Sequence, residues 1–299
     1  MVTARTLSPE EAQPLVEAIE APVAKRRRRG LLRYNADGWS LAWMQLTLFV
    51  SLLPFAVRLP LWAEAALLVP MLFLRSSVAY LQHNQSHLGV FWSRPLNFIY
   101  DLELALMSGY VTPLWEQHHV NGHHRHYLTP EKDPARTLDL RTGRDVSRLR
   151  YVIYGNATVL QDAWRIGSAQ AAEGRPDPLP RAVAQFVLVC LAAAALAWIN
   201  PPAFVGFILV PNVLVAWGVW HISYDHHLNL PSTTHMNGSH SHLSAGFNLL
   251  TFNIGHHAAH HEKPTLHWSL LPARSAQLFP RLAPESVHGK LPKSVAPSR

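Results

Sequence analysis

Residues 182–220 read AVAQFVLVCLAAAALAWINPPAFVGFILVPNVLVAWGVW. Two uncharged apolar segments lie within this stretch, from Ala182 to Ile199 and from Ala203 to Trp220. Each is close to the length of roughly 20 residues that an α-helix needs to cross a bilayer core. The intervening Asn200-Pro201-Pro202 predicts a tight turn. The stretch therefore predicts a hairpin of two membrane-spanning helices.

An earlier part of the chain repeats this pattern. Apolar segments run from Trp39 to Val57 and from Leu61 to Gln82, joined by Arg58-Leu59-Pro60. Only 15% of the residues are charged, whereas about a quarter is usual for a soluble domain. Two hairpins with spans of this length favour a membrane protein over the buried core of a soluble one. We expect an all-α membrane protein with four transmembrane helices in two hairpins and a cytosolic helical cap that carries the histidines.

The charge distribution predicts which side of the membrane the connections occupy. A basic run, Lys25-Arg26-Arg27-Arg28-Arg29, precedes the first apolar segment. Such a run also suits a nucleic-acid-binding arm, but beside a membrane span we favour a cytoplasmic anchor, because positive residues stay inside and attract anionic lipid. Hairpins return the chain to its starting side. We therefore expect an integral, multi-pass protein with both termini and all histidine clusters cytoplasmic, and no nucleic-acid partner.

The connections contain further helical signals. Residues 93–115 mix apolar residues with Asp101 and Glu103, which is typical of a helix lying on or dipping into the membrane interface. Residues 127–180 are polar, and within them we expect a helix from about Ser147 to Ala172. The predicted organisation has three parts: a polar, basic lead at 1–34, a single membrane domain at 35–275, and a C-terminal tail at 276–299.

The placement of the 19 histidines is the strongest signal in the sequence. None occurs before His83, and none lies between His126 and His221. The histidines gather in three places that adjoin or follow the cytoplasmic ends of apolar segments. Histidines scattered over a surface or a core would not avoid all other regions in this way.

The first cluster is His83-Asn84-Gln85-Ser86-His87, an HxxxH spacing directly after the second span. On a continuing helix, positions i and i+4 share a face, so two imidazoles can reach one ion. Taken alone, this spacing is explained more commonly by a pair of interfacial histidines.

The second cluster, residues 118–126, reads HHVNGHHRH, and within it His119, His123 and His124 give HxxxHH. Adjacent residues on an α-helix point about 100° apart. A terminal HH pair can therefore direct one imidazole to each of two neighbouring ions, while the upstream histidine completes one ligand set.

The third cluster, residues 256–261, reads HHAAHH, and His257, His260 and His261 give HxxHH. One such box would be weak evidence. Three boxes beside membrane spans are a specific signal for bound metal.

At these boxes the chain resembles the membrane fatty-acid desaturase and hydroxylase superfamily of histidine-box diiron enzymes. Residues 253–261, NIGHHAAHH, look like the third box of bacterial acyl desaturases. Residues 116–135, with HHVNGHHRHYLTPEKDPA, look closer to the second box of alkane hydroxylases. The resemblance covers roughly Leu61 to Leu271 and mixes features of two branches.

The resemblance implies a mushroom-shaped, four-helix stem under a cytosolic cap, with two irons held almost wholly by histidine and O2 as co-substrate. It implies no catalytic residue beyond the metal centre. A further ligand is expected after the fourth span, where His226 and His227 are candidates and His226 is favoured. The metal ligands carried over by motif are His83, His87, His119, His123, His124, His226, His257, His260 and His261.

The expected reaction is the removal of hydrogen from an unactivated C–H bond of a lipid-like or acyl substrate. Neutral imidazole suits Fe, Zn, Cu and Ni, but eight or nine histidines fit two ions with open positions better than a catalytic zinc with three protein ligands. We favour desaturation, with hydroxylation by the same centre as the alternative. No HPGG stretch marks a fused cytochrome, so the electron donor is expected to be external, such as a ferredoxin, a rubredoxin or a cytochrome with its reductase.

Acidic residues near the boxes leave alternatives open. Asp225, Glu116 and Glu262 lie next to proposed ligands and would either orient imidazoles or serve as ordinary helix-capping groups facing water. Asp101 is interpreted as a solvated or helix-packing group. Residues 130–134, PEKDP, are most simply a turn.

Two other classes of protein remain as rivals. A histidine-rich membrane metal transporter would use these residues as a cation path, but such a path needs polar groups through the bilayer interior, and the boxes stand at the ends of the spans. A zinc-dependent membrane hydrolase is the second rival.

Overall fold

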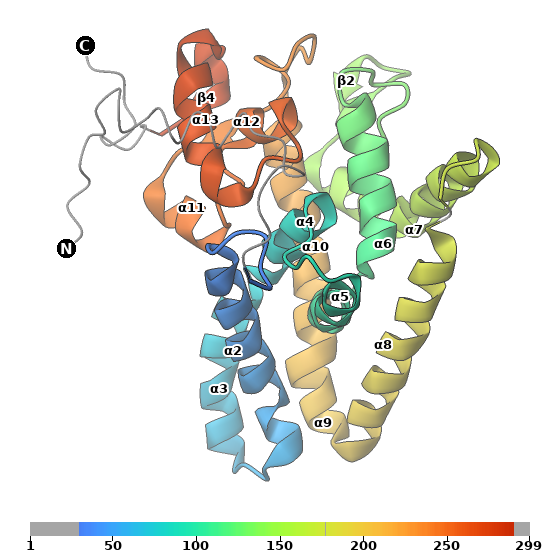
Figure 1. Ribbon diagram of the computed structural model, residues 1–299, viewed down its shortest axis with the longest axis vertical. Coiled ribbons are helices and arrows are strands. Elements are labelled where there is room, and N and C mark those ends of the chain that lie inside the picture. The colour runs from blue at the N-terminus through green and yellow to red at the C-terminus, as the bar shows by residue number, and fades with distance from the viewer. Residues whose placement is uncertain (1–29, 177, 290–299) are drawn as a thin grey trace. The chain divides into compact units, whose positions relative to one another are not determined.

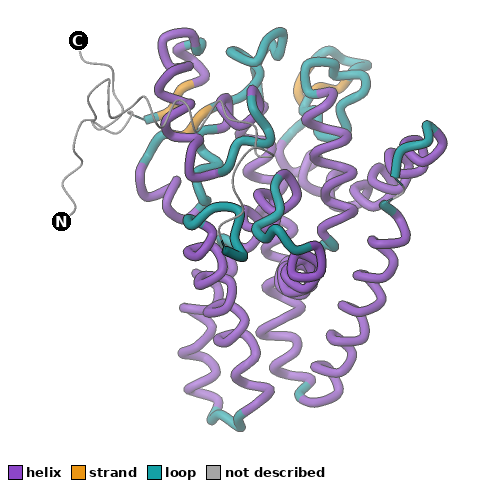
Figure 2. Tube along the Cα trace, in the orientation of Figure 1, coloured by secondary structure: helices purple, strands orange, loops and turns teal. Residues whose placement is uncertain are grey.

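The computed structural model describes residues 30–176 and 178–289, which form mainly helices (Figures 1 and 2). The basic run at 25–29 lies outside the described residues. The chain divides into two compact units after Tyr224. We call Leu31–Tyr224 the membrane unit and the described residues from Asp225 onward the C-terminal unit. The division falls inside the region that the sequence predicts as one domain.

Four helices are long and apolar enough to cross a membrane, which confirms the predicted fold class. The second continues beyond its predicted end through the first histidine box, with a break between α3 and α4. The four are Asp37–Ala56 (α2), Leu61–His87 (α3, Leu61–Arg75; α4, Val78–His87), Leu179–Ile199 (α8), and Pro201–His227 (α9, Pro201–Phe204; the π-helix η3, Val205–Leu209; α10, Val210–His227).

The surface of these helices suits a lipid environment. On α8, Phe186, Leu191 and Trp198 are 54%, 63% and 89% exposed. In water this surface would be costly at about 25 cal/mol per Å² of apolar area. In a bilayer the same side chains face hydrocarbon, and the helix satisfies its own backbone hydrogen bonds.

A buried arginine joins the spans inside the membrane unit. Arg75 is 1% exposed, and its Nη2 donates to the carbonyl oxygens of Phe207 and Ile208, at 3.2 and 3.4 Å, and to Oδ1 of Asn212 at 3.1 Å. Both carbonyls belong to η3, where the regular α-helical bonding register is interrupted. Arg75 therefore faces the protein interior, where a charged side chain in a span is tolerated.

The segment after α4 folds into α5 (Arg94–Ser108) and α6 (Thr112–Trp115). Figure 1 shows α5 nearly end-on, across the direction of the spans. Asp101 of α5 is 5% exposed and accepts hydrogen bonds from Gln85 Nε2 at 2.9 Å and Gln185 Nε2 at 3.1 Å. Burial raises the pKa of Asp101, and the two amides oppose that rise. Asp101 is therefore a helix-packing group that links α4, α5 and α8.

The next connection contains the π-helix η2 (Glu116–His124), a small antiparallel pair β1 (Leu138–Asp139) and β2 (Arg144–Asp145), and the long helix α7 (Arg148–Ala172). The predicted helix from Ser147 to Ala172 is confirmed, with Ser147 as its N-cap. The Tyr151 hydroxyl on α7 donates to the Ala135 carbonyl at 2.8 Å and lies 3.0 Å from Ser223 Oγ. These contacts hold α7 beside the box-bearing segment.

The C-terminal unit is built from short elements around a small apolar core of Ala258, Ala259, Leu271, Leu278 and Leu282. Residues 276–289, predicted as a tail, contribute to this core and to a parallel strand pair. The elements are β3 (Ser241–His242), α11 (Ala245–Leu250), α12 (His257–Glu262), η4 (Trp268–Leu270), α13 (Leu271–Leu278), η5 (Phe279–Arg281), η6 (Pro284–Ser286) and β4 (Val287–His288).

The surroundings of Gly255 explain why glycine directly precedes the third box. A Cβ at this position would lie 2.2 Å from the His242 carbonyl oxygen and 2.6 Å from Asn248 Oδ1. Because the backbone passes so close to β3, only glycine fits directly before the histidines.

We predict that Gly155→Ala destabilises the membrane unit. A Cβ at Gly155 of α7 would lie 2.4 Å from the Trp220 ring, and overpacking of this kind costs about 1–3 kcal/mol. Gly218→Ala is the matched control, since no atom lies within 4 Å of a Cβ built there. Thermal unfolding in detergent would show a lower midpoint for Gly155→Ala alone; equal midpoints would contradict the close packing.

Candidate metal centre

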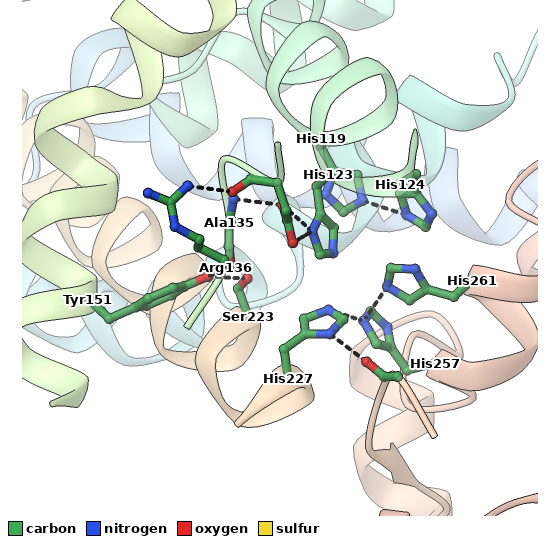
Figure 3. Close-up of polar contacts among 12 residues, drawn as sticks. His119, His123, His124, Ala135, Arg136, Tyr151, Ser223, His227, His257 and His261 are labelled. Atoms are coloured by element: carbon green, nitrogen blue, oxygen red, sulfur yellow. Dashed lines mark hydrogen bonds and ion pairs between the residues drawn. The ribbon is translucent and has the colours of Figure 1, made fainter. Parts of the chain in front are cut away.

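Histidines gather within each of the two units (Figure 3). In the membrane unit, His83 and His87 come from α4, and His119 and His124 come from η2. One ring nitrogen of each lies within 4.8 Å of the others. The Nε2 atoms of His119 and His124 are 3.1 Å apart, so four imidazoles converge on one point.

Two helix types produce this convergence. On α4, the HxxxH spacing places both rings on one face, as expected. Box two lies on a π-helix, whose hydrogen bonds join residues i and i+5. The π register therefore pairs His119 with His124, whereas an α-helix would pair His119 with His123. The sequence prediction assumed α-helical geometry for this box and did not say which member of the terminal pair joins His119.

His123 turns to a carboxylate that sequence reasoning missed. Its Nδ1 lies 2.9 and 3.0 Å from the two oxygens of Asp133, and both side chains are buried. Asp133 also accepts a hydrogen bond from the Ala135 amide at 2.8 Å, which fixes the carboxylate. The Nδ1–H of His123 donates to Asp133, so its Nε2 keeps a lone pair for a metal. The turn at 130–134 is thus also an orienting element; an acid in a tight turn shortly after a box is the signal that would have found it.

In the C-terminal unit, three imidazoles meet through their Nε2 atoms. His257 Nε2 lies 3.3 Å from that of His227 and 3.1 Å from that of His261. The Nδ1–H of His227 donates to the Gly238 carbonyl at 3.0 Å, which leaves the His227 Nε2 lone pair directed at His257. His226 instead stacks on His257, with ring centroids 3.8 Å apart. The geometry favours His227 as the ligand from α10, while the sequence prediction favours His226.

His260 is buried on α12, with its ring centroid 5.7 Å from those of both His257 and His261. It points away from the face shared by His257 and His261, which are four residues apart. The divergence of His260 and His261 agrees with the expectation that a terminal HH pair serves two ions.

The donor set fits metal ions. Two nitrogens bound at about 2.1 Å to one ion, at angles near 90–110°, lie roughly 3.0–3.4 Å apart, and the observed Nε2 separations are 3.1 and 3.3 Å. Burial lowers the pKa of His257 well below its usual value, and the neighbouring imidazoles lower it further. The neutral ring is the form that binds a metal.

A family comparison agrees with the site. The model for the fatty acid desaturase family matches residues 59–289. The chain belongs to the fatty acid desaturase family. This finding confirms the resemblance read from the histidine boxes, and together with the four spans it identifies an integral membrane protein. A comparison with curated proteins finds no match.

Not every histidine of this family member joins a group of converging nitrogens. His118 is 1% exposed between the rings of Trp115 and Trp220, and burial lowers its pKa to about 3. In the C-terminal unit, His288 Nε2 lies 2.9 Å from His240 Nδ1, and His288 stacks on His242.

Two acids beside the boxes pair with arginines. Glu116 bonds to Arg181, and Glu262 bonds to Arg274 through both carboxylate oxygens. Burial raises the pKa of Glu116, and the charge of Arg181 opposes that rise. These ion pairs anchor η2 and α12 and so position the histidines that follow or precede them.

A cavity of about 900 Å³ lies in the membrane unit along η2 and α7. Trp220, Gly155 and Ile166 contribute apolar surface to it. Seven Arg or Lys side chains line it, among them Arg125 and Arg136, against four Asp or Glu side chains. The cavity has room for a substrate group and favours one with negative charge.

We predict that Asp133→Asn weakens metal binding by about 10–100-fold. The Asn side chain lacks the carboxylate charge, and its amide N–H at the second oxygen position also faces His123 Nδ1, so the tautomer with a lone pair on Nε2 is less favoured. Chelator competition on the purified protein measures the affinity. Asp162→Asn, which removes a partly buried carboxylate paired with Arg165, is the control. Equal affinities in the two variants would show that His123 is not a ligand.

Proposed function

We propose that this desaturase-family protein is an O2-dependent diiron oxidoreductase that attacks an unactivated C–H bond of a lipid-like or acyl substrate, with desaturation as the favoured outcome. The observation that carries the proposal is the convergence of buried imidazole nitrogens within each unit at separations suited to a shared ion. Family membership supports the choice of iron over zinc.

The histidines divide into two candidate ligand sets. His83, His87, His119 and His124 would hold one ion in the membrane unit. His227, His257 and His261 would hold the other in the C-terminal unit. His123 in the membrane unit and His260 in the C-terminal unit remain proposed ligands. When bound, the two irons would use O2 and two external electrons to remove hydrogen from the substrate.

The remaining polar groups would prepare these ligands. The Asp133 carboxylate and the Gly238 carbonyl accept hydrogen bonds from the Nδ1–H groups of His123 and His227. The Nε2 atoms of these rings would then be available to the metal ions. The low exposure of His119, His257 and His261 keeps water from the rings, and burial lowers the pKa of His257. The cavity along η2 would receive part of the substrate, and a small displacement of the reacting carbon would be costly.

The partners and the sidedness are part of the same proposal. The ends of the spans that carry the boxes are placed in the cytoplasm, with both termini, by the positive-inside rule. Electrons would come from a separate carrier such as a ferredoxin, a rubredoxin or a cytochrome with its reductase.

Hydroxylation is the second candidate, because the second box, residues 116–135, looks closer to that of alkane hydroxylases. The metal site would be the same, and only the fate of the substrate after loss of the first hydrogen would differ. A metal transporter is disfavoured by the position of the histidine groups at the ends of α4 and α10.

Mass-spectrometric profiling of lipids from cells expressing the wild type and His260→Ala tests this function. A new double bond in the wild type alone would support desaturation and locate the position attacked. A hydroxylated product would assign the hydroxylase alternative. Identical profiles in a host supplied with candidate acyl substrates, a reductant and a donor protein would contradict the proposal.

We predict that His227→Ala loses iron while His226→Ala retains it. His227 directs its Nε2 at His257 Nε2, at 3.3 Å, whereas the His226 ring stacks on the His257 ring. Iron per chain after identical purification separates the two. Retention by His227→Ala with loss in His226→Ala would restore His226 as the ligand from α10.

A further inference from the structure

Helix α7 exposes a stripe of large apolar side chains. Leu149, Ile153, Leu160 and Trp164 are 59%, 53%, 55% and 55% exposed. They follow one another at spacings of four, seven and four residues, so they share one face of an α-helix. A stripe of this size on a helix of 25 residues needs a partner that the helix's own packing does not supply.

The other faces of α7 are occupied differently. Tyr151, Val152, Val159 and Ala163 are buried and form the face that packs into the membrane unit. Beside the stripe lie exposed polar residues, including Arg150 and Arg165, whose side chains are 66% and 68% exposed. The two arginines pair with Asp139 and Asp162 and also border the cavity along η2 and α7. Helix α7 is not among the four candidate spans, so it presents a buried face, an apolar stripe and a cationic flank in turn.

This arrangement fits the boundary between headgroups and acyl chains. Six residues separate the end of α7 at Ala172 from α8 at Leu179, and the exposed apolar surface resumes on α8 at Val183 and Phe186. The stripe is therefore close in the chain to surface that faces lipid. Interfacial helices bury such a face about 5–10 Å deep, and basic residues beside it attract anionic lipid.

We propose that α7 lies on the cytoplasmic leaflet, with Leu149, Ile153, Leu160 and Trp164 among the acyl chains and Arg150 and Arg165 at anionic lipid phosphates. The apolar stripe is separate from the metal groups, and its contact with lipid goes beyond the proposed function, while Arg150 and Arg165 also line the cavity along η2. The buried face of α7 holds the box-two segment through Tyr151. Anionic lipid bound to α7 would therefore stabilise the helix that packs against the second histidine box.

A cysteine-label scan tests the placement. Cys190 is the single cysteine, so Cys190→Ala gives the background for single labels at 153, 160 and 164, with polar-flank controls at 161 and 168. In nanodiscs containing phosphatidylglycerol, labels on the stripe should be quenched by lipid-borne nitroxides and show several-fold lower iodide quenching than the controls. Equal iodide quenching at all five positions would overturn the proposal, as would shielding caused by a second copy of the chain, seen as cross-linking between stripe cysteines.

The lipid charge provides the second arm. The protection of the stripe labels from iodide should be greater in phosphatidylglycerol nanodiscs than in pure phosphatidylcholine nanodiscs. Arg150→Gln/Arg165→Gln should lose most of this difference in iodide quenching. The matched double variant Arg58→Gln/Arg94→Gln removes the same charge from exposed sites off α7 and should keep that difference. Equal behaviour of the two variants would overturn the role of the arginines. Bound metal is measured in parallel and should stay at the wild-type level, so the outcome is independent of the proposed chemistry.

Discussion

The close approach of imidazole nitrogens is the constraint on which the rest of the structure depends. The Nε2 atoms of His119 and His124 lie 3.1 Å apart, as do those of His257 and His261. Two such nitrogens attract each other when one of them carries an N–H, and when both present lone pairs they need a cation between them. Each unit therefore has to hold its rings rigidly enough that an ion finds the nitrogens already in place.

The membrane unit supplies this rigidity with polar groups that a lipid-facing helix could not tolerate. Asp101 ties the box-bearing α4 to α5 and α8 through Gln85 and Gln185. Arg75 draws α3 onto the carbonyls of η3, at the start of the span that ends in His227. Both charged side chains form hydrogen bonds with backbone carbonyls or amide side chains inside the protein. The large apolar side chains exposed on the spans suit contact with lipid. The C-terminal unit achieves the same with a short strand pair and with Gly255, which lets the backbone pass β3.

Hydrophobic length was enough to predict the four spans, and the polar stretch at 127–180 was expected to contain the helix at 147–172. Histidine spacing pointed to the groups on α4, η2 and α12, but the prediction favoured His226 over His227. The pairing within box two was not predictable from α-helical periodicity, since η2 takes a π register that depends on packing against α7 and α6. Asp133 escaped because PEKDP has the composition of an ordinary turn, and its contact with His123 exists only after the chain folds back. The choice between His226 and His227 depends on the Gly238 carbonyl, which no spacing rule locates. Roles that follow from a local sequence pattern could be predicted. Roles that depend on a single long-range hydrogen bond could not.

The most direct measurement is iron-edge X-ray absorption, with metal quantification, on protein purified after iron-replete expression. The account predicts two irons per chain, a first shell dominated by imidazole nitrogen, and no stoichiometric zinc. A single bound ion, zinc in place of iron, or a shell dominated by carboxylate oxygen would contradict it.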